Sequence, residues 1–135
     1  KQCCLLNLME DYSKILVKTL KKIPGFNKVM FVILYGSHTN GKTNKFSDID
    51  FAIFYKGDKK ERFKFRLKLL AKLPDDFDIQ IFQDIPLFVR KDVLKGRLIY
   101  AKNSSYAYDI AYQTIKEFDH FKKYYYDYIG LEAMT

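Results

Sequence analysis

Residues 29–35, Val-Met-Phe-Val-Ile-Leu-Tyr, form the longest apolar run in the chain and constrain its fold more than any other segment. The run is far shorter than the ~20 apolar residues that a membrane-spanning helix requires. Its β-branched and aromatic side chains favour a strand, and the lack of polar alternation is typical of a strand buried on both faces. We therefore predict a central strand at 28–35, inside a sheet flanked by helices.

Hydrophobic periodicity places the other elements around this strand. Apolar residues recur at helical spacing from Leu5 to Leu20, and Pro24-Gly25 ends this first helix. Alternating patterns predict further strands at 48–55, 77–82 and 97–100. Helices are predicted at 59–73, from Pro86 to Gly96 and at 104–128, with a short helical turn and loop at 37–47. This order predicts a single α/β (α+β) domain over residues 1–135, with a small mixed sheet and a catalytic core at about 28–100.

Composition limits the partners and the compartment without choosing among functions. The formal net charge is +8, which attracts nucleic acids, nucleoside triphosphates or acidic proteins. The only two cysteines, Cys3 and Cys4, are adjacent and have no nearby ligand pattern, so neither a stabilising disulfide nor a zinc site is expected. The first residues resemble neither a secretory signal nor a transit peptide, and we expect a cytoplasmic protein without membrane contact.

Three aspartates lie on two of the predicted strands. Asp48 and Asp50 are two residues apart, so their side chains point to the same face of a strand. Asp78 begins a similar alternation in the third strand, and three carboxylates converge if that strand lies beside the second. Like charges side by side on a sheet are unfavourable without a cation, and carboxylate oxygens suit Mg²⁺. Asp75, Asp76 and Asp84 are alternatives for the third carboxylate, but they fall at predicted turns.

Gly36 and Ser37 follow the central strand directly and are predicted to bind phosphate. Glycine lets the backbone approach a phosphate closely, and free amide groups and a serine hydroxyl can bind its oxygens. A triphosphate at the end of one strand and metal ions at the start of the next is an arrangement suited to phosphoryl transfer.

The segment Leu34-Tyr35-Gly36-Ser37, followed by Ser47-Asp48-Ile49-Asp50-Phe51, resembles the active-site signature of the DNA polymerase β-like nucleotidyltransferases. It looks most like the minimal nucleotidyltransferases, or MNT proteins, and the resemblance extends from about residue 31 to residue 100. It implies that Gly36 and Ser37 hold the triphosphate of ATP. It further implies that Asp48, Asp50 and Asp78 bind two Mg²⁺ ions and that Asp78 is a candidate general base.

The chain departs from the family pattern at one position. Many relatives carry arginine after the Gly-Ser pair, whereas this chain has His38. Lys42 or Lys45 could neutralise phosphate in its place, and Lys42 is our candidate.

The resemblance also implies a partner. Similar proteins act as antitoxins that transfer AMP from ATP onto a tyrosine of a helical HEPN-domain toxin, and this is the leading hypothesis. The alternatives are nucleotidyl transfer to a small molecule such as an aminoglycoside, and a non-catalytic antitoxin that acts by binding. Polymerase activity on nucleic acid is the least favoured, because no template-holding module is evident.

Two predicted helices have surfaces whose role the sequence does not assign. The helix at 59–73 is predicted to be basic and amphipathic, with apolar residues Phe63, Phe65, Leu67, Leu69 and Leu70. Its basic residues favour a solvated face over a polyanion-binding surface. The tyrosine-rich helix at 104–128 carries more aromatic residues than one helix face can bury, and an oligomer or partner surface is possible there.

Overall fold

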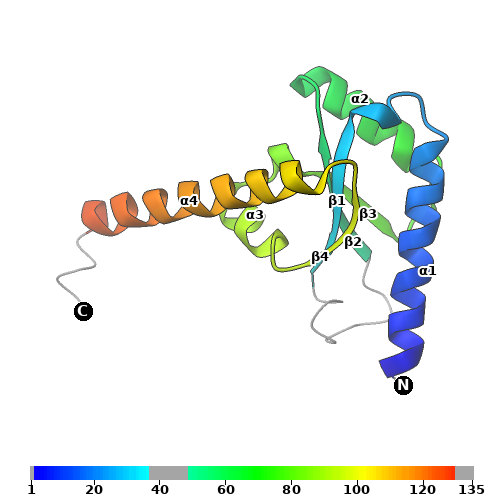
Figure 1. Cartoon of the computed structure of the whole chain (residues 1–135), viewed down its shortest axis with the longest axis horizontal. Coiled ribbons are helices and arrows are strands. Elements are labelled where there is room, and N and C mark those ends of the chain that lie inside the picture. The colour runs from blue at the N-terminus through cyan, green and yellow to red at the C-terminus, as the bar shows by residue number, and fades with distance from the viewer. Residues whose placement is uncertain (1, 37–48, 130–135) are drawn as a thin grey trace.

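The computed structural model describes residues 2–36 and 49–129, which form a four-stranded mixed sheet with helices on both faces (Figure 1). The strands, in chain order, are β1 (Val29–Tyr35), β2 (Ile49–Tyr55), β3 (Phe77–Ile81) and β4 (Arg97–Ala101). In space their order is β3-β2-β1-β4, with β2 parallel to β3 and β1 antiparallel to β2 and β4. The predicted mixed sheet flanked by helices is confirmed.

The helices are α1 (Gln2–Lys21), α2 (Lys59–Leu70), α3 (Leu87–Val93) and α4 (Ser104–Ile129). Short 3-10 turns, at Phe26–Lys28 and Phe82–Asp84, precede β1 and follow β3. Each of the four helices lies close to its predicted position. The predicted helical turn at 37–47 falls outside the described residues.

The uncharged strand β1 lies in the middle of the sheet, as its composition predicts. On one face, Leu16 and Leu20 of α1 and Phe65 and Leu69 of α2 pack against one side of the strands. On the other face, a second cluster joins Phe31, Ile33, Ala52, Phe82, Ile85, Val93 and Ala107 beneath α3 and α4. Both faces of β1 are therefore covered, which explains why it needs no polar residue.

Helix α2 corrects one expectation. The sequence suggested an apolar face that includes Phe63 and Leu67, but these side chains are 57% and 47% exposed. Phe65 and Leu69 alone are buried in this helix. A spacing of two residues cannot keep side chains on one side of a helix, whereas residues four apart share a face. The helix also ends at Leu70, before the predicted boundary.

The two arginines of α2 bind neighbouring parts of the fold. Arg66 Nε donates to the carbonyl oxygen of Ile79 on the edge strand β3, at 2.7 Å. Arg62 forms an ion pair with Asp84, with 2.7 Å between Nη2 and Oδ1. These contacts agree with the interpretation of α2 as a packed helix whose outer face is solvated.

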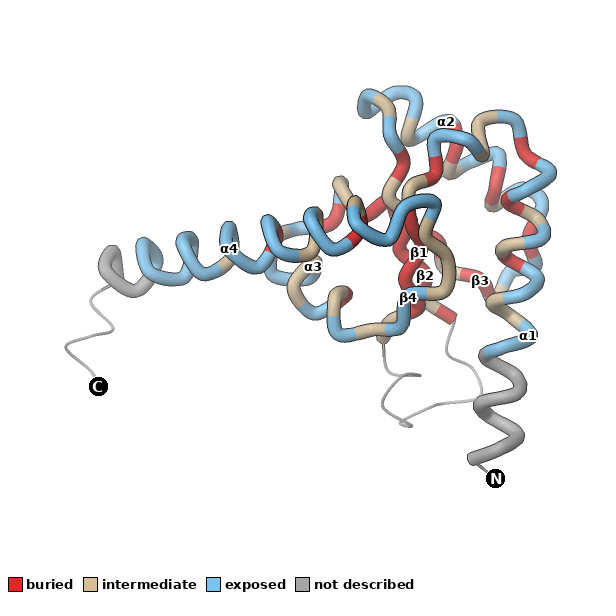
Figure 2. The backbone as a smooth tube through the Cα atoms, viewed as in Figure 1, coloured by how far each residue is buried: buried red, intermediate tan, exposed pale blue. Residues whose placement is uncertain are grey.

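Helix α4 extends well beyond the sheet (Figure 1), and most of its surface is exposed (Figure 2). Phe88 of α3 contacts Phe118 and Phe121 edge-on, so α3 supports the middle of α4. Among its tyrosines, Tyr108 and Tyr112 are 70% and 63% exposed. In the part of the chain that the structure describes, no helix is both long enough and apolar enough to span a membrane.

Candidate active site at the Gly36 end of the sheet

Two of the predicted metal-binding carboxylates lie side by side. Strands β2 and β3 are parallel, and their register pairs Asp50 directly with Asp78. Neighbouring residues in register on adjacent strands point to the same face, and strands are spaced about 4.8 Å apart. Both side chains are partly exposed. They share their face with Ala52, so they belong to the side of the sheet covered by α3 and α4.

Tyr35 extends this pair into a row across three strands. The antiparallel register of β1 and β2 places Tyr35 opposite Asp50. Burial, followed by the charges of Asp50 and Asp78, raises the pKa of Tyr35 to about 12. The phenol therefore stays protonated and neutral at physiological pH. Sequence reasoning did not assign Tyr35 a role, although its position directly before Gly36 was a usable signal.

Gln80 is a second residue that sequence reasoning did not assign to the site. Its Nε2 donates a hydrogen bond to Asp78 Oδ1, at 3.1 Å. Gln80 follows Asp78 by two residues on β3 and therefore lies on the same face. This bond restricts the rotation of the Asp78 carboxylate and leaves its other oxygen for a further ligand or proton.

Gly36 ends β1 beside this row. Its φ of +94° lies in the left-handed region, which residues with a Cβ rarely adopt. A Cβ at this position would also overlap Asp50 Oδ2. The close approach of the Gly36 backbone to the Asp50 carboxylate thus depends on glycine for two independent reasons.

The remaining predicted site residues lie outside the described part of the chain. These are Ser37, His38, Lys42, Lys45 and Asp48. Within residues 2–36 and 49–129, no group of three or more His, Cys, Asp or Glu side chains could hold a metal ion. The described part contributes the pair Asp50 and Asp78, whose oxygen donors and adjacent negative charges fit a divalent cation such as Mg²⁺.

The alternative carboxylates have other contacts or positions. The Tyr12 hydroxyl donates to the Asp76 carboxylate, and Asp84 pairs with Arg62. Asp75 is exposed in the turn before β3. Of the four acidic residues between 75 and 84, Asp78 is the one that the strand register pairs with Asp50.

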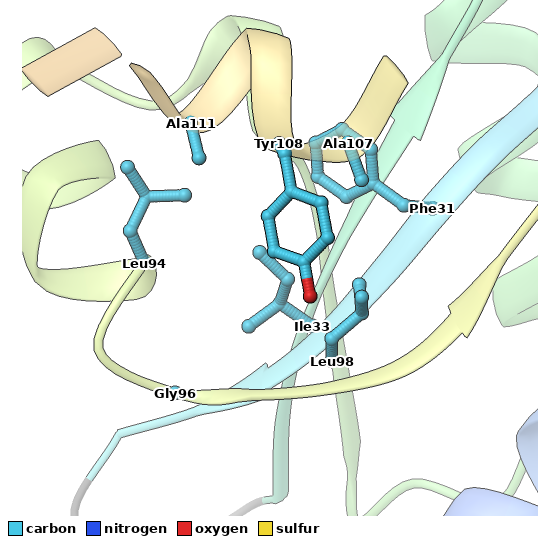
Figure 3. Close-up of a pocket in the computed structure, with 8 residues that line it drawn as sticks. All are labelled: Phe31, Ile33, Leu94, Gly96, Leu98, Ala107, Tyr108 and Ala111. Carbon is cyan, nitrogen blue, oxygen red and sulfur yellow. The ribbon is translucent and has the colours of Figure 1, made fainter. Parts of the chain in front are cut away.

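A cavity of about 110 Å³ lies on the same side of the sheet, beneath α4 (Figure 3). Its lining is almost entirely apolar and contains no carboxylate or basic side chain: Phe31, Ile33, Leu94, Gly96, Leu98, Ala107, Tyr108 and Ala111. A cavity of about 150 Å³ is known to hold benzene, so this smaller one cannot enclose a purine base. The cavity is therefore distinct from the carboxylate pair and unsuited to a triphosphate.

Comparison with known proteins identifies the class of enzyme to which this fold and site correspond. Residues 12–105 match the family described as "Polymerase beta, Nucleotidyltransferase". This match covers more than half of the chain, and the chain belongs to this nucleotidyltransferase family.

One curated relative and several solved structures are similar to the chain. The "Putative protein adenylyltransferase" of Methanocaldococcus jannaschii is 32% identical over 73 residues, which are 54% of this chain and 56% of the relative. The chain thus aligns with about half the length of this relative.

Two solved structures resemble the fold over most of its length. A chain in a toxin–antitoxin structure with AMP-PNP has a TM-score of 0.68 and 23% identity, covering 91% of this chain and 98% of that chain. A chain in a structure of a tri-AMPylated Shewanella oneidensis HEPN toxin with an MNT antitoxin has a TM-score of 0.63 and 22% identity. It covers 91% of this chain and 96% of that chain. At these identities the likeness establishes the fold.

Proposed function

We propose that this chain is a Mg²⁺-dependent protein adenylyltransferase that moves AMP from ATP onto a hydroxyl of a HEPN-domain toxin and thereby acts as its antitoxin. The observation that carries the proposal is the row of Asp50 and Asp78, in register beside Gly36, in a nucleotidyltransferase chain. The name of the M. jannaschii relative and the toxin–antitoxin structures support the protein acceptor. A cytoplasmic location is consistent with the supply of ATP.

The roles proposed for the site residues follow from their chemistry. Asp48, Asp50 and Asp78 hold two Mg²⁺ ions, and Gly36, Ser37 and Lys42 bind the triphosphate. When bound, Mg²⁺ would neutralise phosphate charge and orient the reacting oxygens. Gln80 holds the Asp78 carboxylate in place through the hydrogen bond to Oδ1.

The transfer itself is a displacement at the α-phosphorus of ATP. The acceptor oxygen forms a new bond to this phosphorus, and the bond to the β-phosphate oxygen breaks. AMP remains on the acceptor, and pyrophosphate leaves. Asp78 is the proposed base for the proton of the acceptor hydroxyl, for which a tyrosine of the partner is the leading candidate.

A transfer assay with the neighbouring gene product tests the proposal. The purified chain is incubated with α-labelled ATP and Mg²⁺, with and without this partner. We expect label on the partner, and its loss in Asp50→Asn and Asp78→Asn. The matched control is Asp92→Asn, which removes an exposed carboxylate of α3 that pairs with Lys95.

The outcomes separate the candidate functions. Label on the partner with the control variant but not with the site variants supports the proposal. Bound Mg²⁺-ATP without transfer to the partner would overturn the protein acceptor and favour a small molecule or a binding role. Absence of nucleotide binding under all conditions would overturn the proposed enzyme.

A further inference from the structure

The hydroxyl of Tyr12 connects α1 to the start of β3, across 64 residues of sequence. It donates a hydrogen bond to Asp76 Oδ2. The ring of Tyr12 packs against Phe77, with 5.0 Å between the ring centroids. Asp76 and Phe77 are the two residues directly before Asp78. Tyr12 therefore fixes the backbone that positions the Asp78 carboxylate.

The same residue, Asp76, also binds β2. Its backbone carbonyl accepts a hydrogen bond from the Ile49 amide, at 2.9 Å. Ile49 precedes Asp50 and is in register with Phe77. Asp76 therefore uses its side chain to bind α1 and its carbonyl to bind β2, two residues before Asp78.

Phe77 continues this connection inside the core. It stacks on Phe51 of β2, with 5.9 Å between the centroids. Phe51 is the residue directly after Asp50 in β2, and Phe77 is the residue directly before Asp78 in β3. A displacement of Phe77 would consequently shift β3 along β2 and change the spacing of Asp50 and Asp78.

The hydroxyl of Tyr12 is not needed to attach α1 to the sheet. Leu16 and Leu20 are both fully buried and already anchor the helix. The bond to Asp76, with burial and the Asp76 charge as lesser causes, raises the pKa of Tyr12 to about 12. The hydroxyl thus remains a donor across the physiological range.

We infer that Tyr12 is a positioning residue for the active site: its bond to Asp76 sets the relative position of the Asp50 and Asp78 carboxylates. The inference rests on the proposed role of these carboxylates as metal ligands. Mutation of a residue that hydrogen-bonds to a metal ligand typically changes metal affinity by about 10–100-fold. Tyr12 acts through two further residues, so we expect about a 3–10-fold effect on cation affinity for Tyr12→Phe.

Mn²⁺ binding, measured by electron paramagnetic resonance without any transfer reaction, tests the inference. Tyr12→Phe keeps the ring that packs on Phe77 and removes the donor, so its Mn²⁺ dissociation constant should rise. The matched control is Tyr100→Phe, which removes a hydroxyl from a partly buried tyrosine packed on the same core cluster. Tyr100 lies on β4, which pairs with β1 alone among the described strands. Its variant should bind Mn²⁺ like the wild type.

Two further variants separate positioning from general loss of packing. Asp76→Asn retains an oxygen that can accept the Tyr12 hydroxyl, so its Mn²⁺ affinity should stay closer to the wild type than that of Asp76→Ala. Adding Tyr12→Phe to Asp76→Ala should produce no further loss, because the bond is already absent. Urea unfolding of each variant establishes that the folded protein is being compared.

Each result bears on one of the two ideas. A Tyr12→Phe affinity within twofold of the wild type, or an equal loss in Tyr100→Phe, would overturn the positioning role. A wild type that binds Mn²⁺ but transfers no AMP would overturn the proposed function, while the affinity ratios would still decide the role of Tyr12. A wild type that binds no Mn²⁺ would overturn both.

Discussion

Gly36 lies so close to Asp50 that a methyl group on its Cα would overlap the Asp50 Oδ2 atom. Gly36 also has a φ of +94°. The close contact with Asp50 and the left-handed backbone therefore both require glycine at the end of β1. In a nucleotidyltransferase this contact brings the backbone that is proposed to bind phosphate next to a proposed metal ligand. The geometry of the site therefore requires Gly36, as does the backbone conformation of the turn.

The first prediction concerns Gly36→Ala. A left-handed conformation costs a residue with a Cβ about 1–2 kcal/mol, and the overlap with Asp50 adds to this cost. Displacing the Asp50 carboxylate should also lower the transfer rate at least ~10-fold, since misplacements of about 1 Å are costly in catalysis. Urea unfolding and the transfer assay measure the two effects.

Gly25→Ala is the matched control for this prediction. Gly25 has a φ of +99°, and a Cβ there would lie 2.7 Å from the Tyr55 hydroxyl oxygen, away from the carboxylate pair. It should lose a similar free energy of unfolding and retain its transfer rate when folded. Equal losses of activity in both variants would show that Gly36 matters only for stability.

The second prediction concerns the repulsion between Asp50 and Asp78. Like charges directly opposite on adjacent strands are destabilising by up to about 1 kcal/mol. Without divalent cations, Asp78→Asn should therefore be as stable as the wild type or slightly more stable. With Mg²⁺ the order should reverse, because a bound cation stabilises only the folded wild type.

Thermal unfolding with EDTA and with Mg²⁺ measures this reversal. The exposed Asp92→Asn serves as the control and should follow the wild type under both conditions. An equal response of all three proteins to Mg²⁺ would contradict a cation site at Asp50 and Asp78.

The sequence predicted the strands because these depend on local periodicity. It did not predict the roles of Tyr12, Gln80 or Arg66, because each depends on a contact made in the folded state. Tyr12 binds a residue 64 positions away, and no periodic pattern records such a pair. Asp78 was predicted from alternation, whereas its register with Asp50 follows from how β2 and β3 pair.

The third prediction concerns Arg66, which covers the outer edge of β3. Its guanidinium donates to the Ile79 carbonyl, at 2.7 Å. Loss of a hydrogen bond from a charged donor costs about 1.5–3 kcal/mol, and partial exposure of this one favours the lower end. Arg66→Ala should lower the free energy of unfolding by about 1–2 kcal/mol.

Lys64→Ala provides the comparison on the same helix. Lys64 is exposed, so its replacement should change the free energy of unfolding by less than about 0.5 kcal/mol. Urea denaturation of both variants gives the difference. Equal stability of the two variants would mean that the Arg66 bond adds nothing to the edge of the sheet.

The last prediction concerns the pH dependence of stability through Tyr12. Its hydrogen bond to Asp76, then burial and the charge of Asp76, raise its pKa from the ordinary value of 10.0 to about 12 in the folded chain. Between these values the unfolded chain has released the proton and the folded chain still holds it. The stabilisation by Tyr12 is thus fully present below pH 10 and is lost as the pH rises to about 12.

Comparison of the wild type with Tyr12→Phe isolates this contribution from other groups that titrate at alkaline pH. The difference in their free energies of unfolding should be constant below pH 10 and shrink between pH 10 and about 12. Urea denaturation at a series of pH values measures it. A difference that stays constant through pH 12 would show that the hydroxyl does not donate to Asp76 in solution, and the link from α1 to the carboxylate pair would be lost with it.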